Sequence, residues 1–155
     1  MAGTLKAWGG IIAVVALVAA AGYGLYMGAQ NRGDAQVHVD GVVLPYVAAN
    51  VAGEHAAARE RYTTPDWKVR HTLDELAGSY RIARDEYGGV TGFRLHNTQT
   101  EYAPGGEEAL NVRGFLQLGD GNELPVTFML IETGNGAWLI ERSWTRGSGG
   151  HPGPW

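Results

Sequence analysis

The chain has 155 residues, of which 16 are acidic, 12 are basic and none is cysteine. This length allows one small domain, and the net charge of -4 argues against nucleic acid as the main partner, because proteins that bind nucleic acid usually carry a basic face. The lack of cysteine excludes a disulfide scaffold, a thiol catalyst and a thiolate metal site.

An apolar segment near the N-terminus predicts a membrane anchor. No charged side chain occurs in residues 7–31, and residues 8–28 would form a helix of roughly 31 Å, close to the ~30 Å hydrocarbon layer of a bilayer. Trp8 lies at one end of this segment and Tyr23 and Tyr26 at the other, which is typical of aromatic rings at the two membrane interfaces. We expect residues 1–28 to be a retained transmembrane anchor.

A cleavable signal peptide is the alternative for the same segment. Lys6 would supply its charged start, residues 11–18 its apolar run and residues 19–21 its small-residue cleavage site.

For a retained anchor, the short leader and the acidic domain favour a cytoplasmic N-terminus and a periplasmic or otherwise extracytoplasmic domain at the inner membrane.

Small residues recur every four positions along the predicted anchor. Such a stripe lets a second helix backbone approach closely, so it predicts a partner within the membrane, although alanine and glycine are also common in spanning helices. The stripe consists of Ala16, Ala20, Gly24 and Gly28.

Residues 29–44 are expected to form an extended juxtamembrane linker with a short strand over residues 37–43. From Pro45, apolar side chains at helical spacing predict an amphipathic helix that ends near Pro65. Thr72 and Glu75 match a capping box, so a second amphipathic helix is expected from there to Gly88. The stripe of the first helix comprises Val47, Val51, His55, Ala58 and Tyr62.

Before the end of this second helix, apolar residues recur every three or four positions, and after it they recur every two positions. Turn-forming residues separate four alternating segments, which predicts an antiparallel meander. The fold class is therefore α+β: one transmembrane helix, then two amphipathic helices on a four-stranded antiparallel sheet within a domain of residues 45–145. A tail rich in glycine and proline follows at residues 146–155. The four predicted strands are residues 90–102, 109–118, 124–132 and 137–145.

This order of elements resembles small members of the NTF2-like/cystatin-like superfamily. The resemblance rests on the helix start at residues 72–76 and on the closing hairpin around residues 134–136, which ends in an apolar strand with Trp138. Membrane-anchored relatives of this type are docking or scaffolding domains, whereas some soluble relatives are isomerases or dehydratases. The order is also similar to the single-span assembly-factor domains of respiratory oxidase.

The chemical signals in the domain are few. His55 is the one histidine on an apolar helix stripe, so it is the best candidate for a base in a ligand pocket, although a packed histidine gives the same pattern. His38 and Asp40 with Glu54 or His55 supply too few converging ligands to predict a metal site, and no cofactor is expected. Trp67, Trp144 and Trp155 lie at element edges or in the tail, where they could contact a partner or close the ends of the core.

These patterns favour a non-enzymatic accessory or assembly subunit of a membrane protein complex, of respiratory or photosynthetic type. It would contact other subunits through its anchor, its α+β domain and its tail, and would bind no nucleic acid. The alternative is a membrane-tethered, cone-shaped domain that binds a small ligand or acts as an isomerase, with His55 in its pocket.

Overall fold

A computed structural model describes residues 33, 35–102, 105–145 and 154–155. The chain divides into two compact units, Met1–Gln36 and Val37–Trp155. The expected membrane anchor lies outside the described residues, and among those that are described no helix combines the length and the apolar character needed to cross a bilayer.

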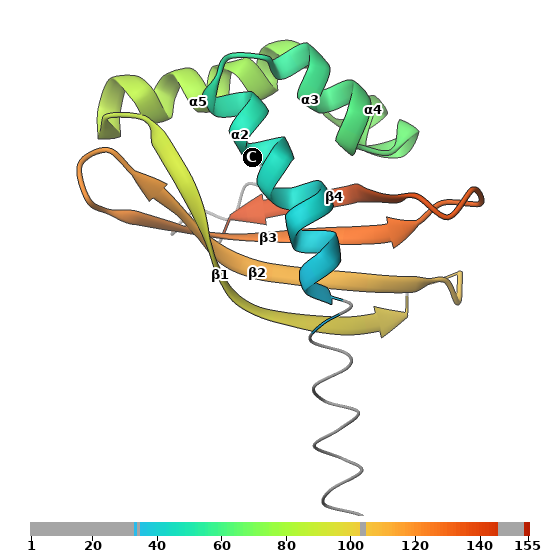
Figure 1. Ribbon diagram of the computed structural model, residues 1–155. Helices are drawn as coiled ribbons and strands as arrows, with labels where there is room; N and C mark the ends of the chain where they lie inside the picture. Colours follow the sequence, from blue (N-terminus) through green and yellow to red (C-terminus); the bar gives the residue numbers. More distant parts are fainter. Residues whose placement is uncertain (1–32, 34, 103–104, 146–153) are drawn as a thin grey trace, which may run out of the picture. The chain divides into compact units, whose positions relative to one another are not determined.

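Four antiparallel strands form one sheet in the order β1-β2-β3-β4, so each strand pairs with its neighbour in sequence (Figure 1). The predicted meander is therefore confirmed, with strand ends that differ from the expected ones by one residue at most. The strands are β1 (Val90–Tyr102), β2 (Glu108–Leu118), β3 (Glu123–Glu132) and β4 (Trp138–Thr145).

The helices pack on one face of this sheet, which we call the covered face (Figure 1). Its side chains alternate along β2 and β3 with those of the opposite face, as the period of two requires. The ring of Tyr46 lies 5.9 Å from that of Phe128 and 6.4 Å from that of Trp67, which joins two helices to the sheet. The buried side chains of the covered face are Leu110, Val112, Leu116, Val126, Phe128, Leu130 and Ile140.

Two helix starts have side-chain caps, and the one at Thr72 is the capping box that the sequence predicts. The hydroxyl of Thr72 accepts a hydrogen bond from the backbone N–H of Glu75, whose carboxylate accepts one from the Thr72 N–H in return. Thr64 caps the shorter helix before it and accepts from the N–H of Trp67 at 3.1 Å. These helices are α4 (Pro65–Arg70) and α5 (Leu73–Tyr87), and the left-handed Gly88 ends α5.

The first predicted helix and the linker before it need correction. Gly53 adopts φ +81°, a left-handed conformation that ends one helix, and a second helix starts two residues later. The expected single helix is therefore α2 (Leu44–Val51) and α3 (His55–Tyr62). The expected strand at residues 37–43 is also wrong, because η1 (Val39–Val43) is a π-helical turn that continues into α2 and buries Val39 and Val43.

A β-bulge in β4 determines which side chains face the helices near its end. Leu130 pairs with Ile140 but Met129 pairs with Arg142, so Glu141 is an extra residue. The Glu141 carboxylate accepts hydrogen bonds from the Thr64 hydroxyl and the Arg70 guanidinium of α4. The bulge thereby connects the sheet to the helix layer and reverses the alternation of β4 after it.

Candidate functional site

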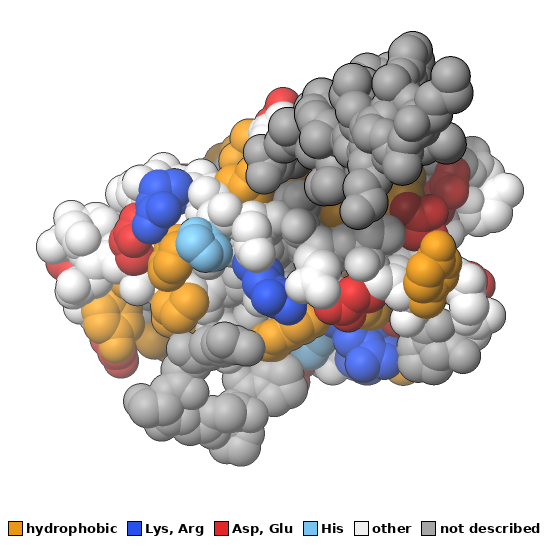
Figure 2. Space-filling view, turned by 90° about the horizontal axis from the view of Figure 1, so that it is seen from below, with side chains coloured by type: hydrophobic (Ala, Val, Ile, Leu, Met, Phe, Trp, Pro, Cys, Tyr) orange, Lys and Arg blue, Asp and Glu red, His pale blue; other side chains and the backbone are white. Residues whose placement is uncertain are grey.

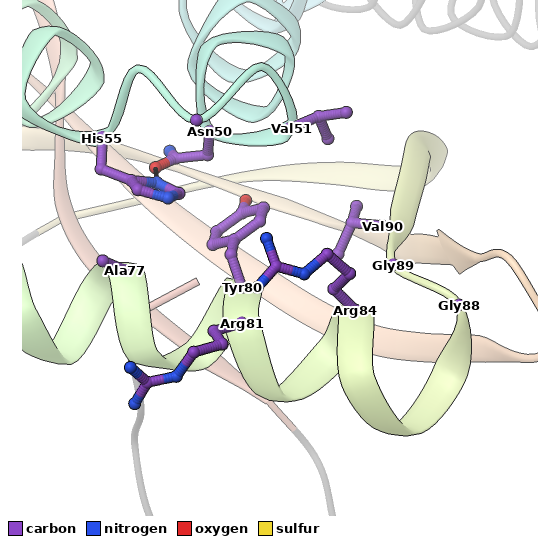
Figure 3. A pocket seen from close by; sticks show the side chains of 11 residues that line it. Asn50, Val51, His55, Ala77, Tyr80, Arg81, Arg84, Gly88, Gly89 and Val90 are labelled. Atoms are coloured by element: carbon purple, nitrogen blue, oxygen red, sulfur yellow. Dashed lines mark hydrogen bonds between the residues drawn. The ribbon is translucent and has the colours of Figure 1, made fainter.

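A pocket of about 270 Å³ lies between the α2–α3 turn and helix α5 (Figure 3). One wall carries the side chains of Asn50 and His55, and the other carries those of Tyr80 and Arg84. Gly88, Gly89 and Val90 close its end where α5 turns into β1. The break at Gly53 places His55 at the start of a new helix, where its imidazole turns toward Tyr80.

A chain of hydrogen bonds fixes the orientation of His55. Asn50, which is buried, donates through Nδ2 to the carbonyl of Tyr46 at 3.0 Å, so its Oδ1 is left as an acceptor. His55 Nδ1 lies 2.8 Å from this oxygen and therefore acts as the donor. Burial lowers the pKa of His55 below its ordinary value, which favours the neutral ring. The neutral ring then keeps Nε2 as an acceptor.

Two buried phenol groups beside this histidine have no hydrogen-bond partner for their hydroxyls among the described residues. They belong to Tyr46, which is fully buried, and to Tyr80, which is 7% exposed and lines the pocket. The rings of His55 and Tyr80 lie 5.6 Å apart. Burial raises the pKa of both phenols; the neighbouring Tyr80 adds to the shift of Tyr46 and the side chain of Asn50 opposes it, so both phenols stay protonated. An unsatisfied buried hydroxyl costs stability, so Tyr80 has capacity for a ligand.

The charge at this pocket is positive. Arg81 and Arg84 contribute to its lining, and none of the described residues that line it is acidic. The guanidinium of Arg84 extends toward Tyr80, four residues earlier on the same helix, whereas that of Arg81 extends away from His55 and Asn50 (Figure 3). Arg84 Nε contacts Asp85 at 3.4 Å, a pair in which both side chains are mostly exposed and which therefore contributes little.

The second candidate site is the face of the sheet that bears no described helix, which we call the open face (Figure 1). Several apolar side chains on this face are only half-buried. Figure 2, which looks from below at the β1 side of the sheet, shows apolar, basic and acidic side chains together. A groove of about 530 Å³ runs along its β4 side, between Met129, Trp144, Arg142 and the end of α4 at Arg70 and His71. The half-buried apolar residues of the open face are Phe115, Pro125, Met129, Ile131, Leu139 and Trp144.

The open face also holds an unsatisfied amide. Asn111 is 4% exposed, and its Oδ1 accepts no hydrogen bond from the described residues. Asn111 pairs across the sheet with Met129, at the groove. Neighbouring Arg113 and Arg142 form no ion pair within the described part of the chain. The face therefore offers apolar area, two unpaired cations and one acceptor.

The residues proposed from the sequence fall in different places. Trp67 is fully buried and its indole N–H donates to Ser143 Oγ at 3.4 Å. It is therefore a core residue, which is the second of the two roles considered for it from the sequence. Trp144 lies in the groove of the open face, and the ring of Trp155 lies 6.2 Å from that of Tyr80. The remaining ones lie outside the described residues: Trp8, Ala16, Ala20, Tyr23, Gly24, Tyr26 and Gly28.

Side chains fill the space between helices and sheet where a cone-shaped domain would hold its ligand. Tyr46, Trp67, Leu76 and Phe128 have no exposed surface there. The His55 pocket lies outside this core, between two helices. Within the described ranges no three His, Asp or Glu side chains converge as metal ligands would.

Sequence reasoning selected His55 but missed its neighbours. Tyr80 is a buried residue of α5, and neither Asn50 nor Arg84 belongs to a sequence motif. One signal was available: Arg84 follows Tyr80 by four residues, so the two share one side of α5. This side of α5 meets the α2–α3 turn only because the helix breaks at Gly53. The apolar periodicity of the sequence did not indicate that break.

No protein-family model matches the chain, and no curated protein and no solved structure is significantly similar to it. The likeness to the NTF2-like/cystatin-like superfamily therefore stays a prediction.

Proposed function

We propose that this chain is a non-enzymatic accessory or assembly subunit of a membrane protein complex, with one N-terminal membrane anchor and an extracytoplasmic docking domain. The apolar segment at residues 8–28 supports the anchor, and its small-residue stripe supports a partner helix. A respiratory or photosynthetic complex is the host that we expect, at the inner membrane, with the domain on the periplasmic side.

The observation that carries the proposal is the open face of the sheet. Protein interfaces combine apolar area with arginine and tryptophan, and Trp144 and Arg142 line the same groove there. The occupant that fits is an extramembrane segment of another subunit with acidic and apolar side chains. Its carboxylates would pair with Arg113 and Arg142, and one backbone N–H would donate to Asn111 Oδ1.

A direct test uses the full chain extracted from its own membranes in a mild detergent. We expect it to migrate in a large assembly during gel filtration, and migration as a free monomer would contradict the proposal. Arg142→Glu should reduce the co-purified partner by roughly tenfold, because it places a negative charge against an acidic segment. Arg61→Glu is the matched control, since Arg61 is also exposed but lies on α3, away from the open face.

A second pair of variants separates the anchor from the domain. Gly24→Leu with Gly28→Leu should weaken the association if a partner helix packs on the stripe. Loss with Arg142→Glu alone assigns the contact to the open face, and loss with the glycine variants alone assigns it to the membrane. If Arg142→Glu and the glycine variants all co-purify with the partner as the wild type does, neither the open face nor the stripe is a contact surface, and the proposal is contradicted.

A further inference from the structure

We infer that the pocket between the α2–α3 turn and α5 is a binding site for a small organic carboxylate, held by Arg84 and Tyr80 beside the imidazole of His55. The site is separate from the open face, and it does not depend on the proposed docking function. Its evidence is a cavity, a buried hydroxyl that lacks a partner and a positive wall.

The charge of the lining selects the sign of the ligand. The guanidinium of Arg84 extends toward Tyr80, and none of the described residues that line the cavity is acidic, so an anion would be attracted. Arg84 uses Nε for Asp85, and no hydrogen bond within the described residues occupies its terminal nitrogens. Those two nitrogens can bind both oxygens of one carboxylate, which is the geometry that arginine favours.

The buried polar groups select the rest of the ligand. Tyr80 keeps a protonated hydroxyl that can donate to a carboxylate oxygen, and no described residue takes that role. The rings of His55 and Tyr80, which both line the cavity, lie 5.6 Å apart, so a flat apolar body would find aromatic neighbours. His55 Nε2 is an acceptor that favours a ligand with an additional hydroxyl or amide hydrogen.

The volume limits the size of the ligand. At about 270 Å³ the cavity is slightly smaller than the usual range for drug-sized ligands, so it suits a molecule of the size of benzoate. A ligand with so few atoms binds weakly, and we expect a dissociation constant on the order of 1 mM. Benzamide has nearly the same shape without the charge and should bind at least tenfold more weakly.

The test titrates benzoate into the full chain in a neutral detergent and follows the imidazole signals of His55, which lines the cavity, by NMR. Saturable binding should be weakened roughly tenfold by Arg84→Gln and remain unchanged in Arg61→Gln, which removes the same charge from α3 outside the pocket. Inorganic phosphate in a parallel titration distinguishes a carboxylate site from general attraction of anions. Non-saturable binding, equal affinity for benzamide, or equal effects of the two arginine variants would each overturn the inference.

Two tyrosine variants separate binding from folding. Tyr46→Phe and Tyr80→Phe both remove a buried hydroxyl that lacks a partner, so neither should lower the melting temperature. Only Tyr80 lines the cavity, so Tyr80→Phe should weaken benzoate binding about fivefold while Tyr46→Phe leaves it unchanged. Equal affinity of wild type and Tyr80→Phe for benzoate would show that the Tyr80 hydroxyl does not bind the carboxylate, and it would overturn the role that the inference gives to Tyr80.

Discussion

On the covered face of the sheet the large side chains are enclosed by helices, whereas on the open face they remain half-exposed. Phe128 and Ile140 have no exposed surface, and the indole N–H of Trp67 is bonded to Ser143 on this side. Across the sheet, Met129 and Trp144 border a groove, and Asn111 holds an unsatisfied oxygen. The covered face is closed by packing and stabilises the fold, whereas the open face keeps half-exposed apolar area with which it can bind a partner.

The largest expected difference between the two faces is in the cost of truncating a tryptophan. Trp67→Ala removes a fully buried ring and should lower the free energy of unfolding by about 3–5 kcal/mol. Trp144→Ala removes a half-buried ring and should cost less than half of that. Urea unfolding of both variants, followed by circular dichroism, measures the difference. Equal losses would mean that the open face is as much a core as the covered one.

A pair of glycine substitutions tests how tightly the covered face is packed. A methyl group on Gly114 would overlap with the ring of Phe93 and the carbonyl of Arg94, so Gly114→Ala should destabilise by about 1–3 kcal/mol. Gly78 lies within α5 with open space around it, and Gly78→Ala should stabilise by about 0.8–1 kcal/mol, because alanine favours a helix. The melting temperature should therefore shift in opposite directions in the two variants, and a shift of the same sign in both would contradict the close contact between Gly114 and β1.

The smallest expected effect concerns the histidines that border the two candidate sites. Burial lowers the pKa of His55 below 6.5, and it also lowers that of His71, where Glu75 opposes the shift and Arg70 adds to it. The unfolded chain therefore takes up these protons first as the pH falls below about 6.5, and the free energy of unfolding decreases there. Above that pH both states are neutral and the effect is absent.

Each histidine can be tested separately by comparing unfolding at about pH 7.5 and about pH 5.5. His55→Gln should reduce the loss of stability at the lower pH, since glutamine can still donate to Asn50 Oδ1 without taking up a proton. His71→Gln provides the same comparison at the open-face groove. An unchanged pH dependence in both variants would show that neither ring is kept neutral by the fold.

Local patterns predicted the sheet and the helix caps well. Alternation gives the ends of β1 to β4, and the Thr72–Glu75 pair determines where α5 begins, because both depend on residues that are close in sequence. The break at Gly53 was missed because one glycine can be tolerated inside a helical pattern, and its left-handed backbone has no periodic signal.

The two candidate sites could be predicted only in part. His55 and Trp144 were selected by residue type and position, but their surroundings depend on tertiary structure. The bulge at Glu141 decides that Ser143 faces the helices and Trp144 the open side, and a single extra residue in a ladder leaves the alternating pattern nearly unchanged. The unsatisfied oxygens of Tyr80 and Asn111 become apparent only when all neighbouring donors are known.

The meander leaves β1 as an outer strand that pairs with β2 alone within the described sheet. A long outer strand of this kind can recruit a strand from another molecule and start aggregation. Two register shifts, at Thr91 and at His96, interrupt the regular spacing of its free hydrogen-bonding groups. These irregularities give the protein a built-in protection against self-association through its sheet edge.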